Sequence, residues 1–223
     1  MARCIMKTES IKKLNFIYQR SEDEIIKQTV LEILRIEENR VSGKFDYYKY
    51  VSKELERPIM TGVFHDNGFK VASDAHILIA FKDNYDVSKL EGKVVGKDGA
   101  FIEGNYPKWR AVIPDFISEK HGYRTETVQI DFNKWGEFMK VYKADKKLNQ
   151  ERMWIKIGEQ IYGVNLFNLL TVAMKRIGTD EITNSWSPYG ATAGVCNGSD
   201  GSIALLMPAI RGLDVDEDQF YVF

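Results

Sequence analysis

The chain has 223 residues, of which 44% are hydrophobic and 28% are charged, and its formal net charge is −1. These values are typical of a globular protein and exclude a disordered or fibrous one. The apolar runs, such as residues 203–207, are far shorter than the about 20 residues that a membrane helix needs. The two cysteines, Cys4 and Cys196, are far apart, so neither a disulfide framework nor a thiolate zinc site is indicated. We therefore expect a soluble cytoplasmic protein. Because the net charge is close to zero, the molecule as a whole does not attract nucleic acid, and any such contact must come from a local basic patch.

The first 60 residues predict two helices. Residues 22–38 place apolar side chains close to helical spacing, and Ser21 followed by Glu24 is a capping-box pattern. This predicts an amphipathic helix whose polar face is acidic. A second short helix is predicted over residues 47–56, and it ends before Pro58 because the residue before a proline disfavours helix.

From Thr61 onward, short apolar runs alternate with turn residues, a pattern that predicts strands joined by tight turns. In the first half, the predicted strands are residues 61–64, 69–73, 76–81, 93–95 and 100–103. Prolines stand near both ends of residues 106–114, and a loop follows. We place the end of a first domain there.

The second half repeats this order of elements. Its apolar patterns predict helices over residues 132–142 and 166–177. Its predicted strands are residues 127–130, 154–157, 160–164, 181–186, 191–196 and 202–207. Two consecutive units of helices followed by antiparallel strands predict an α+β protein with domains 1–118 and 119–223, the second carrying a C-terminal extension.

Three segments carry a resemblance to a known family. Residues 71–80 read VASDAHILIA, residues 104–114 read GNYPKWRAVIP, and residues 205–209 read LLMPA. In this order they resemble V-A-T-D-G-H-R-L-A, G-x-F-P-[DN]-[YW]-R-x-[VL]-[IL]-P and Y-[VL]-[VIL]-M-P of the bacterial DNA polymerase III beta subunit, the DNA sliding clamp. Residues 165–174 also look like the helix that precedes the last of these motifs.

The resemblance implies tandem DNA-clamp domains of the processivity fold, with helices packed on antiparallel sheets. It implies a non-catalytic DNA replication accessory protein without a cofactor. A short clamp-binding peptide of a DNA polymerase or another replication protein would dock in an apolar groove between two domains. Carried over position by position, that groove would use Ser73, Ala75, His76, Ile77, Leu78, Pro114, Leu205, Met207, Pro208 and Ala209.

The chain departs from the family in two ways. The family's usual chain has three domains, whereas 223 residues leave room for two, so a six-domain ring would be a homotrimer. Ala75 stands where the family has glycine, and Ile77 stands where it has arginine. The alternative function is a monomeric clamp-fold protein-interaction module of a phage or mobile element, which does not encircle DNA.

Basic residues of the second half are candidates for contact with double-stranded DNA, because neutralising phosphates takes lysine or arginine. Such a charge run is also typical of a solvated helix face. The candidates are Lys134, Lys140, Lys143, Lys147, Lys175 and Arg176.

The chain ends in Gln219-Phe220-Tyr221-Val222-Phe223. This tail resembles the Q-L-x-L-F pattern of peptides that bind sliding clamps, with Gln219, Phe220 and Phe223 at the matching positions. One hypothesis is that the tail occupies a groove of its own or a neighbouring chain as a built-in competitor. The alternative is an extra edge strand or a frayed terminus.

Two histidines and two carboxylates, His65, Asp66, Asp74 and His76, occupy neighbouring predicted strands and turns. A small metallohydrolase built on His65, Asp74 and His76 is a third interpretation, although the spacing matches no established ligand motif. We adopt the interpretation that the aspartates are turn residues and that the histidines are packed or form part of the groove wall. The sequence has neither a G-x-S-x-G motif nor paired cysteine and histidine, so we expect no enzyme activity and no metal.

Overall fold

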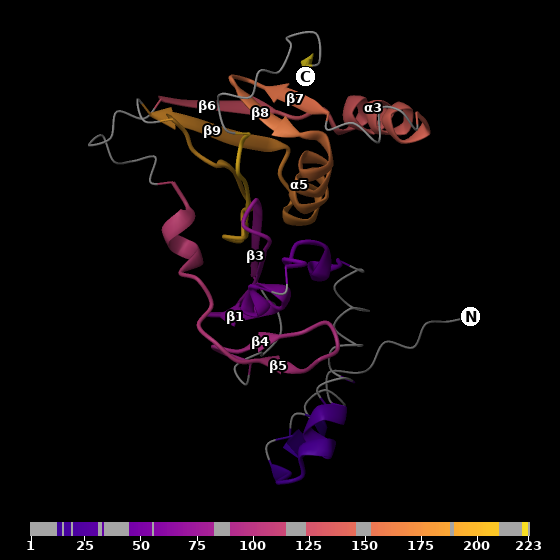
Figure 1. Cartoon of the computed structure of the whole chain (residues 1–223), viewed down its shortest axis with the longest axis vertical. Helices are drawn as coiled ribbons and strands as arrows, with labels where there is room; N and C mark the ends of the chain where they lie inside the picture. Colours follow the sequence, from indigo (N-terminus) through magenta and orange to yellow (C-terminus); the bar gives the residue numbers. More distant parts are fainter. Residues whose placement is uncertain are drawn as a thin grey trace.

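The computed structural model describes residues 13–14, 16–18, 20–30, 33, 45–54, 56–82, 90–114, 124–145, 153–187, 190–209 and 220–222. Over these residues the protein combines a large antiparallel sheet, a small sheet and helices (Figure 1). The α+β class predicted from the sequence is confirmed. Among the described residues, no helix has both the length and the apolar character needed to cross a membrane.

Five strands are formed by the described residues of the first half, all close to the predicted ranges. Asn67 and Gly68 adopt positive φ angles of 50° and 75° in the turn between the first two strands, as a tight two-residue hairpin turn requires. The strands are β1 (Val63–Asp66), β2 (Phe69–Ser73), β3 (Ile77–Lys82), β4 (Val94–Val95) and β5 (Phe101–Ile102). Short 3-10 helices accompany them: η1 (Tyr47–Lys49), η2 (Pro58–Thr61) and η3 (Trp109–Val112).

The described residues of the second half form two α-helices and the remaining strands. Asp131 caps the first helix by accepting hydrogen bonds from the N–H groups of Asn133 and Lys134, and Gly178, with φ of 72°, ends the second. The helices are α3 (Phe132–Ala144) and α5 (Val164–Ile177). The strands are β6 (Arg124–Gln129), β7 (Trp154–Ile157), β8 (Gln160–Gly163), β9 (Glu181–Ser187), β10 (Gly190–Ala191), β11 (Gly194–Asn197), β12 (Ile203–Leu206) and β13 (Phe220–Val222).

One antiparallel pair, β3 with β12, joins the strands of the two halves. Its register pairs Leu78 with Leu205 and Ile77 with Leu206. Through this pair the large sheet of the described residues runs in the order β10-β9-β11-β12-β3-β2-β1-β4-β5, with β6 also paired to β9. The small sheet runs β13-β7-β8. The domain boundary after residue 118 stays a prediction, since the large sheet continues across both predicted halves.

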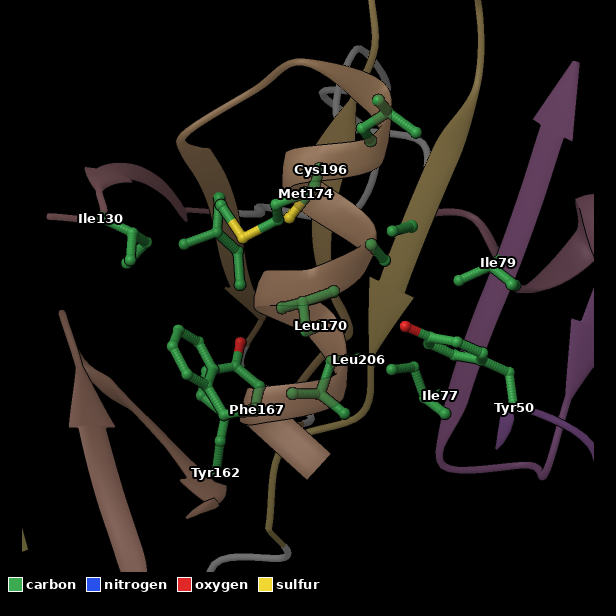
Figure 2. Close-up of a cluster of buried hydrophobic side chains, with 14 of the residues drawn as sticks. Tyr50, Ile77, Ile79, Ile130, Tyr162, Phe167, Leu170, Met174, Cys196 and Leu206 are labelled. Carbon is green, nitrogen blue, oxygen red and sulfur yellow. The ribbon is translucent and has the colours of Figure 1, made fainter. Parts of the chain in front are cut away.

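The main core, which we call the helix-side core, joins residues from one face of the large sheet with residues of the small sheet and of helices α3 and α5. Phe167, Leu170 and Met174 of α5 are fully buried in it (Figure 2). The first half contributes Tyr50, whose hydroxyl donates a 2.9 Å hydrogen bond to the Leu169 carbonyl oxygen. Side chains from both predicted halves therefore share this core.

A buried polar network fastens the small sheet to the large one. The Tyr162 hydroxyl on β8 donates to Asn184 Oδ1 on β9 (2.7 Å), and Asn184 Nδ2 donates to the Ile157 carbonyl oxygen (2.9 Å). Burial raises the pKa of the Tyr162 hydroxyl, so it remains a donor over the physiological range. A Cβ atom at Gly194 would lie 2.7 Å from Ile182 Cδ1 and 2.9 Å from Asn184 Oδ1. This network therefore requires glycine at position 194.

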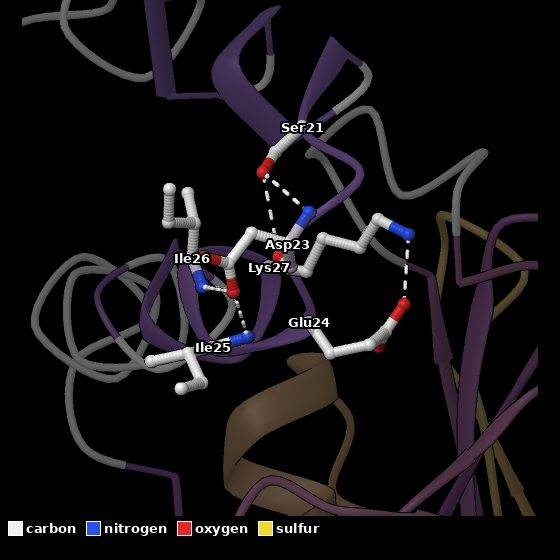
Figure 3. A network of polar contacts seen from close by, with 6 residues as sticks. All are labelled: Ser21, Asp23, Glu24, Ile25, Ile26 and Lys27. Atoms are coloured by element: carbon white, nitrogen blue, oxygen red, sulfur yellow. Dashed lines mark hydrogen bonds and ion pairs between the residues drawn. The ribbon is translucent and has the colours of Figure 1, made fainter.

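Two predictions for the first 60 residues are corrected. The helix predicted over residues 47–56 is only the 3-10 helix η1, and residues 50–54 are not helical. In the predicted helix 22–38, residues 24–30 and 33 are helical, and the rest of its C-terminal part lies outside the described residues. The capping residue is Asp23 rather than Ser21, because Asp23 Oδ1 accepts from the Ile25 N–H at 2.8 Å (Figure 3).

The amphipathic face of this helix also differs from the prediction. Ile25 is 76% exposed, whereas Val30 is buried. The apolar spacing correctly indicated a helix, but it did not show which of the apolar residues contact the rest of the protein.

The Tyr162 network leads to a stability prediction. Tyr162→Phe removes the donor to the buried Asn184 Oδ1 atom and should lower the free energy of unfolding by about 1–3 kcal/mol. Tyr106→Phe is the matched control, because the buried Tyr106 hydroxyl has no hydrogen-bond partner among the described residues. Urea denaturation of both variants measures the difference. Equal losses would show that the network does not contribute to stability.

Candidate protein-interaction surface

The turn between β2 and β3 is built by Asp74. Its Oδ1 atom accepts hydrogen bonds from the N–H groups of His76 and Ile77, both 2.9 Å long. Ser73 Oγ accepts from the Ala75 N–H at 3.1 Å. Ala75 has a φ of +75°, a left-handed conformation that favours glycine. Side-chain acceptors thus hold an alanine in a turn conformation that suits glycine better.

The backbone that follows β12 runs beside this turn. The Met207 N–H donates to the His76 carbonyl oxygen at 2.8 Å, and the Ala209 N–H donates to the Ile161 carbonyl oxygen on β8, also at 2.8 Å. Residues 207–209 are therefore bonded to the β2–β3 turn at one end and to the small sheet at the other. We call the accessible residues of this junction, Ala75, His76, Met207, Pro208 and Ala209, the Met207 rim.

The face of the large sheet opposite the helix-side core carries a second apolar cluster, the Trp109 cluster. It consists of Val71, Leu78, Ala80, Trp109, Ala193, Val195 and Leu205. Because side chains alternate along a strand, Leu78 and Leu205 belong to this cluster, while Ile77 and Leu206 belong to the helix-side core.

Residues 104–114 cover the Trp109 cluster. Tyr106 stacks on Phe64 with ring centroids 4.7 Å apart, and Trp109 is buried. Asp66 at the end of β1 fastens the segment, since Asp66 Oδ2 accepts from the Trp109 indole N–H at 2.8 Å and also forms an ion pair with Arg110. The three segments that carry the family resemblance therefore meet on one face of the sheet.

The structure divides the ten groove candidates into two groups. Four of them are buried in the sheet and are not part of the accessible surface: Ser73, Ile77, Leu78 and Leu205. Ala75, His76 and Met207 are exposed, and Pro114, Pro208 and Ala209 are half-buried. Met207 is the large apolar side chain of this group, and it is 43% exposed.

Sequence reasoning missed the role of Asp66 and Arg110, which hold residues 104–114 in place. The interpretation of Asp66 as a metal-ligand candidate is replaced by its bonds to Trp109 and Arg110. Asp74 is a turn residue, as adopted from the sequence. No group of three or more histidine, cysteine, aspartate or glutamate side chains in the described part of the chain is arranged to hold a metal ion.

The basic candidates do not all lie on one surface. Lys140 and Lys143 are exposed on α3, and a spacing of three residues puts them on the same flank of the helix. Lys134 is also exposed, but it lies nine positions before Lys143, a turn of about 900° along the helix, which places the two on opposite flanks. Lys147 lies outside the described residues.

The two basic residues of α5, Lys175 and Arg176, are exposed at its C-terminal end. Lys175 Nζ lies 4.8 Å from the centroid of the Phe132 ring at the start of α3. These residues therefore lie near the N-terminal end of α3, whereas Lys140 and Lys143 lie in its C-terminal half.

The tail residues 220–222 form β13, which pairs in parallel with β7 (Figure 1). The residues Gln219 and Phe223 lie outside the described residues. Since Ala209 bonds to β8, β13 and Ala209 flank the small sheet on opposite edges. In this structure the described tail is the added edge strand that the sequence analysis gave as the alternative, and competition with an external peptide stays a prediction.

Comparison with known proteins gives structural similarity only. No protein-family model matches the sequence, and no curated protein matches it. A DNA polymerase III beta subunit from Borrelia burgdorferi, solved with a natural product, has a TM-score of 0.47 at 11% identity, over 78% of this chain and 62% of that one. The corresponding subunit from Thermotoga maritima has a TM-score of 0.44 at 14% identity, over 73% of this chain and 60% of that one.

The DNA polymerase III beta chain from Streptococcus pneumoniae has a TM-score of 0.43 at 14% identity, over 77% of this chain and 62% of that one. This chain thus spans about three fifths of the length of the beta subunits it resembles.

The positive φ of Ala75 leads to a second stability prediction. A left-handed alanine costs about 1–2 kcal/mol, while glycine loses about 0.5–1 kcal/mol more chain entropy on folding. Ala75→Gly should therefore raise the free energy of unfolding by up to about 1 kcal/mol. Ala111→Gly, at an exposed position of η3 without positive φ, should lower it. Chemical denaturation checks both signs, and destabilisation by Ala75→Gly would contradict the prediction.

Proposed function

We propose that this chain is a non-catalytic, sliding-clamp-like accessory protein of DNA replication that binds short partner peptides at the Met207 rim. One observation supports this most directly: residues 71–80, 104–114 and 205–209, which resemble clamp motifs, come together on one sheet face. The resemblance assigns peptide docking to the junction of these segments, and the accessible part of that junction is the Met207 rim.

The rim has the physical properties of a peptide-docking surface. Its backbone is held on both sides by the hydrogen bonds of Met207 to His76 and of Ala209 to Ile161, so docking requires little ordering of the protein. The Met207 side chain is accessible, and methionine adapts its shape to different apolar partners. Leucine and phenylalanine anchors of a peptide gain about 1.5–3 kcal/mol each on full burial.

Peptide binding at the rim gives the first functional prediction. A fluorescein-labelled peptide containing Q-L-S-L-F should bind the protein, and Met207→Ala should weaken binding about tenfold or more, because burial of a methionine contributes at least about 1.5 kcal/mol. Fluorescence anisotropy measures the affinity.

Val141→Ala is the control for this experiment, because Val141 is 66% exposed on α3 and lies outside the rim. This variant should bind the peptide like the unmodified chain. Equal effects of the two substitutions, or no peptide binding at all, would contradict docking at Met207.

DNA contact is the second part of the proposed function. Lys140 and Lys143, the exposed pair on one flank of α3, are its best-placed residues. Each phosphate contact contributes about 0.9 to the slope of log affinity against log salt. Charge reversal of both lysines should therefore flatten the salt dependence of double-stranded DNA binding by up to about 2 in this slope.

Reversal of Lys134, on the opposite flank of α3, is the matched control for DNA binding. It should leave the slope unchanged if the Lys140 flank faces DNA. A titration of labelled duplex at several salt concentrations makes the comparison. If the unmodified protein binds no DNA, the DNA part of the proposal fails and the peptide platform remains.

The monomeric interaction module is the second candidate function. It is favoured by the net charge of −1 and by the distribution of the basic residues over separate parts of α3 and α5, since a DNA channel requires a continuous basic lining. Light scattering separates the two candidates. A mass three times the 25.7 kDa of one chain supports a trimeric ring, and the mass of one chain supports the module.

A further inference from the structure

The C-terminal strand β13 (Phe220–Val222) covers the outer edge of β7. The register pairs Phe220 with Trp154, Tyr221 with Ile155 and Val222 with Lys156, in parallel orientation. On its other side β7 pairs with β8. Within the described residues, β13 is therefore the element that satisfies the backbone groups along this edge.

An extended segment can gain affinity at this edge from two sources. The N–H and C=O groups of an uncovered strand edge form a template for another strand. The edge also lies against the core, because Ile155 and Ile157 of β7 are fully buried, and Trp154 and Lys156 are half-buried. Backbone pairing at β7 therefore takes place next to a rigid apolar support.

The connection to β13 is long enough for the strand to leave and return. Ala209 is fixed to β8 by its hydrogen bond to the Ile161 carbonyl oxygen, and residues 210–219 link it to Phe220. Crossing from Ala209 to β13 takes three strand spacings, about 14 Å. Ten residues can span about 33 Å. Release of β13 therefore requires no movement of β12 or of the Met207 rim.

The sequence of the tail is suited to a strand that pairs with β7 and remains soluble when it detaches. Phe220, Tyr221 and Val222 are aromatic or β-branched residues with high strand propensity. The preceding residues include Asp214, Asp216, Glu217 and Asp218, and charges that flank an apolar strand keep it soluble when it is released.

We propose that the outer edge of β7 is a strand-addition site for an extended peptide with consecutive aromatic and β-branched residues, and that the chain's own C-terminal strand occupies it as a displaceable cover. A partner peptide should carry the same residue types as the bound tail and should pair with β7 in the same parallel orientation. The site is separate from the Met207 rim and does not depend on the proposed function.

The tail competes with a partner through its effective concentration. A strand on a short tether has an effective concentration in the millimolar range, so the unmodified chain should bind an external copy of the tail only weakly. Removing the tail, or preventing it from pairing, should uncover the site.

A labelled peptide of residues 216–223 tests this proposal by fluorescence anisotropy. The full chain carrying Tyr221→Pro should bind it at least about tenfold more tightly than the unmodified chain, because proline fixes φ at about −65°, away from the value of about −120° in a parallel strand, and so weakens pairing of the tail. The chain lacking residues 219–223 should behave in the same way. A peptide with proline at the Tyr221 position keeps the residues proposed to bind at the rim but pairs poorly as a strand, so it should show no gain of affinity in either variant.

Circular dichroism shows whether the two variants fold like the unmodified chain. Equal affinities of the three proteins for the peptide would overturn the proposal, and so would the absence of binding by variants that are folded. The tail also resembles the peptides proposed to bind at the rim, so the comparison is repeated in Met207→Ala, where binding at the rim is removed. The gain of affinity caused by releasing the tail should be the same in that background. A gain that disappears in Met207→Ala would place the peptide at the rim and would also overturn the proposal.

Amide hydrogen exchange on the unmodified chain tests the same proposal without a variant. If β13 detaches from β7 while the rest of the protein stays folded, the amides of residues 154–156 should exchange faster than the amides of α5. Addition of the labelled peptide to the Tyr221→Pro chain should restore their protection. Exchange of residues 154–156 only through global unfolding would show that the cover is not displaceable.

Discussion

The antiparallel pairing of β3 with β12 is the interaction on which the rest of this structure depends. It brings residues 77–80 into register with residues 203–206, more than half the chain apart, so its formation must overcome a large loop-closure entropy. Once formed, it unites the strands of both halves into one sheet. It also sets the position of Met207, whose N–H bonds to His76 directly beyond the last paired residues.

The same pairing creates two sheet faces that are covered in different ways. One face packs against helix α5 and the small sheet in a large aromatic and aliphatic core. Helix α3 joins this core through Trp135, whose ring lies 5.0 Å from that of Phe167 on α5. Among the described residues, the 104–114 segment packs on the other face, held at Trp109 and Arg110 by Asp66. The Met207 rim lies between the β2–β3 turn and the small sheet, to which its backbone is bonded on either side.

The sequence predicted most strands and the two long helices because their signals are local. Residues 69–73 follow the Asn67-Gly68 turn and residues 154–157 precede the Gly158-Glu159 turn, and they form β2 and β7 with the predicted bounds. The predictions failed where distant contacts decide. The described residues of 47–56 form the 3-10 helix η1 rather than the predicted helix, and Tyr50 bonds to the carbonyl oxygen of Leu169 on α5, far away in the sequence. The bonds of Asp66 to Trp109 and Arg110 were missed for the same reason, since 43 residues separate Asp66 from Trp109.

The Met207 rim and the β7 edge are supported by one continuous hydrogen-bonded backbone. From β12 the chain passes through Met207 to Ala209, which bonds to Ile161 of β8, and β8 pairs with β7, which pairs with β13. The Tyr162–Asn184 bond ties this small sheet to the large one. Both surfaces are therefore held on rigid strands, and rigid presentation of backbone and side chains lowers the entropy that a binding partner must lose.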